Sequence, residues 1–190
     1  DGSSDNGFTW DVGAFAGGDA LTTLTLTTGS DADDSLTLGA ITAANLEDWT
    51  VTVDDARIAT GAFAATGQLK TLTVNNVSSS STGNVTINNI GNTTSAGNLT
   101  AFNVTTSGTS DDGGSTVVDF GTLDAGGATF TFVMNLNGNY GASDIDTVTA
   151  GGVSSIDIDT GTLGTTLTVD NFDVSGDVGN VDINVGDGFE

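Results

Sequence analysis

The sequence contains no cysteine and no histidine among its 190 residues. The absence of cysteine excludes a disulfide framework, thiolate catalysis and zinc sites built from thiolates. The absence of histidine removes the most frequent general base and the most frequent ligand of transition metals. The remaining candidates for acid–base chemistry are carboxylates in polar turns, where pKa values stay near their ordinary values. We therefore expect that the protein is not an enzyme.

Basic residues are nearly absent as well, because only Arg57 and Lys70 stand against 25 acidic residues, giving a formal net charge of -23. Nucleic acid is excluded as a natural partner, since phosphate binding needs clustered lysine and arginine. The same scarcity of basic residues disfavours attraction to anionic lipid. No apolar run approaches the length of about 18 residues that a membrane-spanning helix needs, so we expect no membrane insertion.

The residues that are abundant favour strands and turns. Glycine occurs 28 times, and only Glu47 and Glu190 of the 25 acidic residues are glutamate, so that 23 are aspartate. Aspartate, asparagine and glycine favour turns, whereas threonine, valine and isoleucine favour strands. Good helix formers are scarce. The composition therefore predicts an all-β protein.

An apolar motif recurs along the chain, in which an apolar residue is followed by a second three positions later and a third two positions after that. The steps between successive copies are 25, 23 and 30 residues from position 21 to position 99, and again 25 from position 153. The six copies are Leu21/Leu24/Leu26, Leu46/Trp49/Val51, Leu69/Leu72/Val74, Leu99/Phe102/Val104, Val153/Ile156/Ile158 and Val178/Val181/Ile183.

A second motif, a glycine followed closely by an apolar residue, lies between these copies, for example at residues 13–15 (GAF), 39–41 (GAI) and 61–63 (GAF). A unit of roughly 25 residues cannot bury its own apolar face, but stacking on its neighbours can. We therefore predict a parallel β-solenoid, or β-helix, of about seven coils stacked about 4.8 Å apart. The glycines are expected to allow positive φ angles at the corners.

Two other folds share parts of this pattern. An antiparallel β-sandwich or jelly-roll also has short alternating strands with frequent turns, and the uneven spacing between residues 128 and 178 is compatible with it. A leucine-rich repeat is disfavoured, because its fixed asparagine or cysteine and its helix are missing. The chain is predicted to form a single domain, 1–190, as a solenoid, with the antiparallel sandwich as the alternative.

Aspartates gather in turn segments, and calcium prefers six to eight oxygen ligands of this kind. Carboxylates stacked about 4.8 Å apart repel by about 0.9 kcal/mol in water and by about 3.5 kcal/mol at an effective dielectric constant of 20, which favours a bound cation. Residues 29–36 (GSDADDSL) partly resemble the calcium-binding RTX nonapeptide, without its second and third glycines. High-salt adaptation is the rival explanation of the acidity. The predicted calcium ligands are Asp31, Asp33, Asp34, Asp54, Asp55, Asp111, Asp112, Asp173 and Asp177.

The composition and the repeated stretches 67–74 (GQLKTLTV) and 97–104 (GNLTAFNV) resemble bacterial surface-layer (S-layer) proteins and related large secreted β-solenoid proteins. The resemblance implies a secreted, extracellular or cell-surface structural protein that assembles with copies of itself through calcium-bridged contacts, as an S-layer or filament subunit. The alternative is an adhesin or carbohydrate-binding surface module whose partner is a cell-surface glycan. The opening residues Asp1 and Gly2 are expected to belong to a processed form or a fragment.

Overall fold

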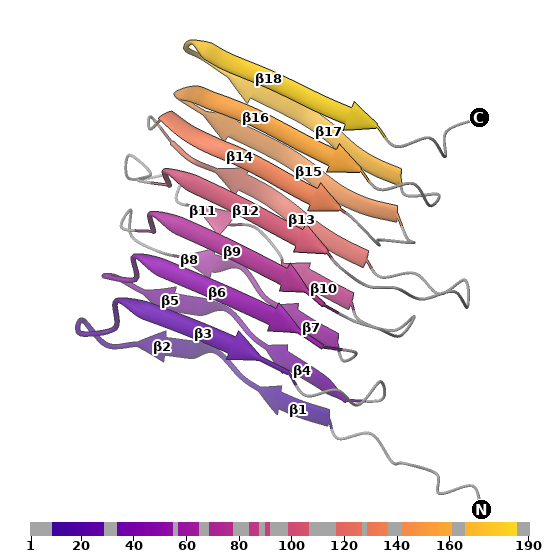
Figure 1. The fold of residues 1–190 in the computed structure, drawn as a ribbon. Helices are drawn as coiled ribbons and strands as arrows, with labels where there is room; N and C mark the ends of the chain where they lie inside the picture. Colours follow the sequence, from indigo (N-terminus) through magenta and orange to yellow (C-terminus); the bar gives the residue numbers. More distant parts are fainter. Residues whose placement is uncertain are drawn as a thin grey trace, which may run out of the picture.

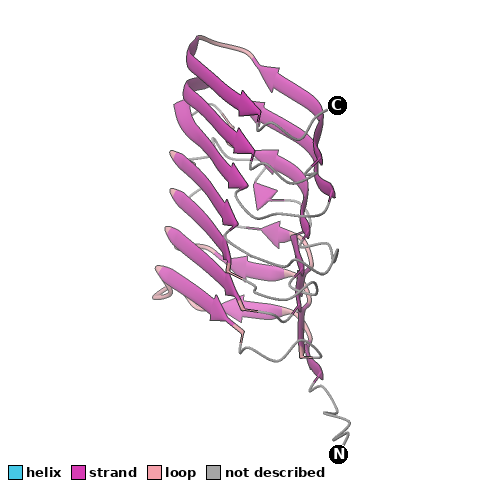
Figure 2. Cartoon of the chain, turned by 45° about the vertical axis from the view of Figure 1, so that its right-hand side comes forward, coloured by secondary structure: helices cyan, strands magenta, loops and turns pink. Residues whose placement is uncertain are grey.

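The chain folds into two parallel β-sheets that face each other (Figures 1 and 2). The structure is a computed structural model, and it describes residues 9–28, 34–54, 57–64, 69–77, 84–87, 90–91, 99–106, 117–126, 129–136, 142–160 and 166–185. Every strand of these residues pairs with strands from the preceding or following repeat, always in parallel, which is the pairing of a β-solenoid and not of an antiparallel sandwich.

Each coil passes first through one sheet, here called sheet A, and then through the other, sheet B. Sheet A consists of β1 (Thr9–Val12), β2 (Phe15–Gly17), β4 (Ser35–Leu38), β5 (Ile41–Ala43), β7 (Arg57–Thr60), β8 (Phe63–Ala64), β10 (Asn84–Ile87), β11 (Ile90–Gly91), β13 (Val117–Asp124), β15 (Ala142–Ala150) and β17 (Thr166–Val174). Sheet B consists of β3 (Thr23–Thr27), β6 (Asp48–Val53), β9 (Thr71–Asn76), β12 (Ala101–Thr106), β14 (Thr129–Leu136), β16 (Gly152–Thr160) and β18 (Val178–Val185).

The parallel solenoid predicted from the repeat is confirmed, with a small difference in the number of coils. The solenoid has about five turns where the repeat predicted about seven coils, and sheet B contains seven strands. The first four coils cross sheet A as two short strands, whereas the last three cross it as the single longer strands β13, β15 and β17. Strand β13 pairs with both β10 and β11, so that a continuous strand can stack on a broken one.

The core lies between the two sheets, because the apolar residues of the repeat point inward in every interior coil. Trp49, which the repeat placed at an apolar position, is fully buried, as are Leu72, Phe102 and Phe132 beside it in sheet B. Alternate residues of the same strands face outward; in β14 buried and half-exposed positions alternate along the strand. Identical positions of successive coils therefore form continuous apolar columns along the stack.

A cluster of phenylalanines joins the two sheets in the middle of the stack. Phe132 of β14 stacks on Phe102 of β12 with ring centroids 5.1 Å apart. Phe132 also meets Phe172 of sheet A edge-on at 5.6 Å and Phe130 at 6.2 Å, and Phe102 meets Phe120 of sheet A at 5.1 Å. Such offset and edge-on pairs add about 0.5–1.5 kcal/mol each to the free energy of burial.

The corner glycines serve close approach between coils, and not the positive φ angles that the sequence led us to expect. A Cβ atom on Gly39 would lie 2.9 Å from the backbone nitrogen of Ala14, and one on Gly61 would lie 2.8 Å from that of Ala40. Among the residues that the structure describes, only Gly126 has a positive φ, of 60°. Glycine is therefore needed at 39 and 61 because the backbone of the preceding coil occupies the space of a side chain.

Candidate functional site

Seven of the nine predicted calcium ligands fall, in the sequence, in segments that connect a strand of sheet B with the next strand of sheet A. We use the term acidic corner for the segments of chain that lead from sheet B to sheet A of the next coil, between β3 and β4, β6 and β7, and β12 and β13. Asp31, Asp33 and Asp34 belong to the first of these segments, Asp54 and Asp55 to the second, and Asp111 and Asp112 to the third. Asp31, Asp33, Asp55, Asp111 and Asp112 lie outside the residues that the structure describes.

The two described aspartates of the acidic corner are tied into neighbouring coils. The backbone amide of Asp54 donates a hydrogen bond to the Thr28 hydroxyl at 3.0 Å. The backbone carbonyl of Asp34 accepts one from the amide of Arg57 at 3.1 Å. Both aspartates are half-buried. Asp54 directly follows the sheet-B strand β6, and Asp34 directly precedes the sheet-A strand β4. Both therefore lie at the corner where the chain passes from sheet B to sheet A.

The other two predicted ligands belong to different parts of the fold. Asp173 is exposed on β17, where its register partner is Thr149, and Asp177 lies at the opposite corner, between β17 and β18. The carbonyl of Asp177 accepts a hydrogen bond from the amide of Val153 at 2.9 Å. Within the described ranges, no three acidic side chains are grouped closely enough to hold a metal ion. Calcium binding therefore stays a prediction.

A pair of carboxylates that the sequence did not indicate lies on sheet A. Asp119 of β13 and Asp144 of β15 are register partners on neighbouring strands, and both are half-buried. One carboxylate oxygen of Asp144 is buried without a hydrogen-bond partner. Burial raises the pKa of Asp119; a backbone hydrogen bond with Asp144 opposes the shift, and the charges of Asp144 and Asp146 add to it.

We predict that Asp119→Asn stabilises the protein at neutral pH. Because the folded state raises the pKa of Asp119, folding favours the protonated carboxyl group. The contribution of the protonated group to stability is therefore complete below the unfolded pKa of about 4 and is lost as the pH rises through the folded pKa. The melting temperature should rise by about 1–3 °C at pH 7, with the gain vanishing below about pH 4. The exposed Asp48→Asn is the control; an equal gain in both variants would contradict the prediction.

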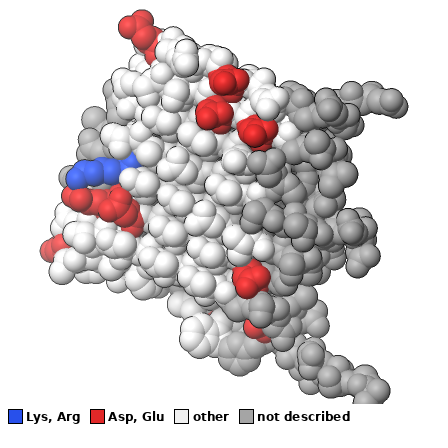
Figure 3. All heavy atoms as spheres, viewed as in Figure 1, with Lys and Arg blue, Asp and Glu red and all other residues white. Residues whose placement is uncertain are grey.

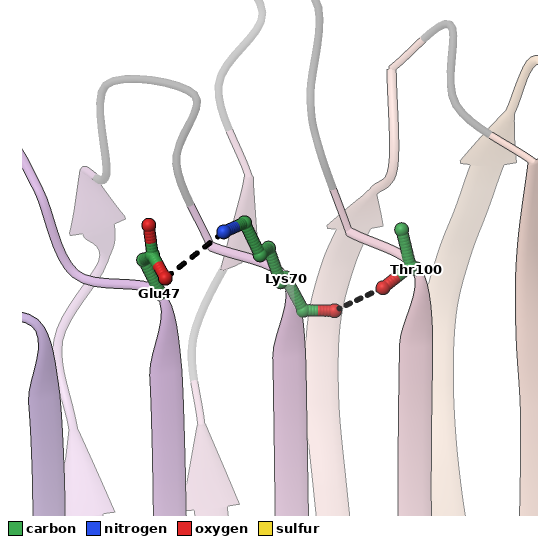
Figure 4. A network of polar contacts seen from close by, with 3 residues as sticks. All are labelled: Glu47, Lys70 and Thr100. Atoms are coloured by element: carbon green, nitrogen blue, oxygen red, sulfur yellow. Dashed lines mark hydrogen bonds and ion pairs between the residues drawn. The ribbon is translucent and has the colours of Figure 1, made fainter.

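One ion pair compensates the acidic charge at the corner where the chain enters sheet B. The Lys70 Nζ lies 2.9 Å from Glu47 Oε2, and the Thr100 hydroxyl donates to the Lys70 carbonyl at 3.1 Å, so that these residues tie three successive coils together (Figure 4). Both charged side chains are about half exposed, and such pairs contribute about 0–1 kcal/mol. Elsewhere the outer face of sheet B carries mainly uncharged side chains with scattered acids (Figure 3).

The second candidate site is the pair of open ends of the stack. Strand β18 is the last strand of sheet B, and its inward-type residues Val178, Val181 and Ile183 are 48%, 54% and 57% exposed. At the other end Trp10 and Val12 of β1 are 59% and 38% exposed. Two coils further in, Phe132 and Met134 at the positions of Val181 and Ile183 are fully buried, and Ile156 and Ile158 in the coil between are partly buried. The chemistry available at both ends is therefore apolar contact and strand pairing.

Comparison of the chain with known proteins gives no match. No protein-family model matches the chain, and neither a curated protein nor a solved structure matches it. In the part of the chain that the structure describes, no helix has the length and hydrophobicity needed to span a membrane.

Proposed function

We propose that the protein is an extracellular structural protein that assembles with copies of itself, as a subunit of an S-layer or a filament. The observation that carries the proposal is the exposure of repeat residues at both ends of an otherwise closed apolar stack, such as Val181 and Trp10. Strand edges with unpaired backbone groups template further pairing unless they are covered. Stacking of further copies on the two ends would cover these side chains and pair these edges.

Calcium is the second part of the proposal. The net charge of -23 opposes the approach of two copies, and only two basic residues can compensate it. Seven of the nine predicted ligands fall, in the sequence, in the three segments of the acidic corner, and Asp34 and Asp54 are the two of them that the structure describes. Calcium bound there would screen the repulsion along the stack and between stacks. The scarcity of lysine and the absence of cysteine fit an extracellular location.

Electron microscopy and light scattering of the purified protein test this function. We expect filaments or sheets in millimolar calcium, dispersal by a chelator, and half-maximal assembly at about 0.1–1 mM calcium, the range of extracellular calcium sites. Magnesium at the same concentration controls for ionic strength. A monomer that is indifferent to calcium and chelator would contradict the proposal, and a monomer that binds a glycan would favour the adhesin alternative.

Two double variants with the same change of charge separate the acidic corner from the rest of the surface. Asp34→Asn with Asp54→Asn is expected to raise the calcium concentration at half-maximal assembly about tenfold, equivalent to about 1.4 kcal/mol of binding free energy. Asp48→Asn with Asp157→Asn, which removes two exposed charges that are not predicted ligands, should leave the midpoint within a factor of two or so of wild type. Equal shifts in the two double variants would assign the effect to net charge alone.

A further inference from the structure

The two end coils of the stack match each other position by position. We call residues 9–28 the N-terminal coil and residues 166–185 the C-terminal coil. Six apolar residues of the C-terminal coil each lie 157 positions after an apolar residue of the N-terminal coil at the same place in the repeat. The pairs are Leu167 and Trp10, Val169 and Val12, Phe172 and Phe15, Val178 and Leu21, Val181 and Leu24, and Ile183 and Leu26.

For the two end coils, the difference in residue number is the same in sheet A and in sheet B. Between neighbouring coils inside the molecule, the register advances by different numbers of residues in the two sheets. From the third to the fourth coil the register advances by 27 residues in sheet A and by 30 in sheet B. From the sixth to the seventh coil it advances by 24 and 25 residues. The other neighbouring pairs also differ between the two sheets, by one to three residues. The end coils therefore have the same number of residues between their inward positions in sheet A and those in sheet B.

The charges of the two end coils would also be compatible with each other if the C-terminal coil of one copy continued the register of the N-terminal coil of the next. Asp182 would lie opposite Thr25 and Asp11 opposite Thr168, so that in these pairs an acid meets a neutral residue. Inside the molecule, by contrast, Asp182 is the register partner of Asp157. A junction between the two ends would thus bring fewer acids into direct opposition than the coil contact between β16 and β18 already tolerates.

The space beside Gly13 is a third observation that fits a further coil stacked on the N-terminal coil. It occupies the position of Gly39 and Gly61, whose absent Cβ atoms make room for the backbone of the preceding coil. No described atom lies within 4 Å of the corresponding point at Gly13, and no described coil stacks on that side. A further coil stacked on the N-terminal coil would occupy this space. Strand β17 is continuous where β1 and β2 are broken, but β13 already pairs with both halves of a broken rung.

We propose that the C-terminal coil of one copy stacks on the N-terminal coil of the next, with β17 pairing with β1 and β2, and β18 pairing with β3. This inference rests on the proposed self-assembly and names its contact. Strands of about 8 residues in sheets about 10 Å apart give an end face of about 500 Å2 per copy, or about 1,000 Å2 for both, which reaches the lower limit of specific interfaces. The contact joins two different surfaces, so it propagates into a filament.

Engineered cysteines test this register, since the natural chain has none. Thr25 and Asp182 are exposed, and the strands that carry them, β3 and β18, are the two outermost strands of sheet B, so a disulfide within one copy is excluded. In the proposed stack their Cα atoms lie about 4.8 Å apart, within the range of a disulfide. A variant with Thr25→Cys and Asp182→Cys, assembled in calcium and then oxidised, should give a ladder of covalent oligomers on a denaturing gel.

The matched control combines Thr25→Cys with Asn180→Cys, two positions out of register, where the Cα atoms would lie about 8 Å apart and no ladder should form. Each single variant should give at most covalent dimers. Circular dichroism spectra and melting curves equal to those of wild type establish that the variants fold. Electron micrographs should show an axial repeat of about 34 Å, for seven rungs about 4.8 Å apart.

The outcomes separate this contact from the proposed function. Polymers of the wild-type protein in micrographs, together with no ladder from the 25–182 pair or an equal ladder from the 25–180 pair, would overturn the end-to-end register and leave self-assembly standing. A monomer that forms neither polymers nor a ladder would overturn both proposals and would mean that another occupant, such as a flanking segment of a longer chain or a different protein, covers the ends.

Discussion

Replacing Phe132 with alanine is expected to destabilise the protein by about 3–5 kcal/mol, the range for removal of a buried phenylalanine. Phe132 is fully buried and contacts phenylalanines of both sheets, so that its loss leaves a cavity in the middle of the stack. For a chain of this size the melting temperature should fall by about 6–20 °C. Because the ring contacts of Phe132 stay within two coils of its own, unfolding of the variant is expected to begin in this part of the stack.

The adjacent residue provides the control for this prediction. Val133 lies on the same strand but on its outward, half-exposed side. Val133→Thr keeps the shape and the β-branched side chain, and it should change the stability by no more than about 0.5 kcal/mol. Thermal and denaturant unfolding followed by circular dichroism measure both variants. A loss of stability in Phe132→Ala no larger than that of Val133→Thr would mean that the phenylalanine cluster does not hold the two sheets together.

Gly61→Ala is the second substitution with a large expected effect. A Cβ atom there would lie 2.8 Å from the nitrogen of Ala40 and 2.8 Å from the carbonyl carbon of Gly39, and backbone atoms cannot move aside as the end of a flexible side chain can. Overpacking of this kind costs about 1–3 kcal/mol. The melting temperature should therefore fall by about 2–12 °C, which thermal unfolding monitored by circular dichroism measures.

Gly13→Ala is the matched control, because the same kind of residue at the same place in the repeat has no described atom within 4 Å of the new Cβ. Its stability as a monomer should stay within about 0.5 kcal/mol of wild type. If both glycine variants melt like wild type, the contact between the backbones of neighbouring coils is looser than the structure indicates.

Much of the fold could be predicted from the sequence because the repeat is a direct consequence of stacking. The copies beginning at Leu21, Leu46, Leu69 and Leu99 each supply a strand of sheet B, and their inward residues form the core. The copy at Phe130, Phe132 and Met134 departs from the motif, because its first spacing is two residues instead of three. The register with β16 shifts between Phe130 and Thr131, and this bulge absorbs the missing residue.

The role of the corner glycines could not be predicted, because it depends on which backbone lies opposite. The sequence around Gly39 and Gly61 is typical of a turn, and turn glycines commonly have positive φ angles. The need for glycine at these two positions arises instead from the coil before, whose residues lie more than 20 positions away. Only the three-dimensional register brings these segments together.

Of the candidate site, the sequence predicts that the aspartates lie in turns, but not how they are arranged in space. Asp34 and Asp54 lie in connections between strands, whereas Asp173 lies on β17 and Asp177 at the opposite corner, and their calcium binding stays a prediction. The pair Asp119 and Asp144 was missed, because residues 25 positions apart become neighbours only through strand pairing. Each of these residues alone is an ordinary outward position of a strand.

The serial arrangement of the coils gives the chain a mechanical property. Strands β1 and β18 lie at opposite ends of the stack, and the hydrogen bonds between coils run along its length (Figure 1). A pulling force along this direction acts on every coil contact in series, so the weakest contact opens first and the others keep their structure. Each opened coil of about 25 residues would lengthen the chain by about 85 Å, at about 3.4 Å per residue, so that a strained polymer could stretch stepwise before it breaks.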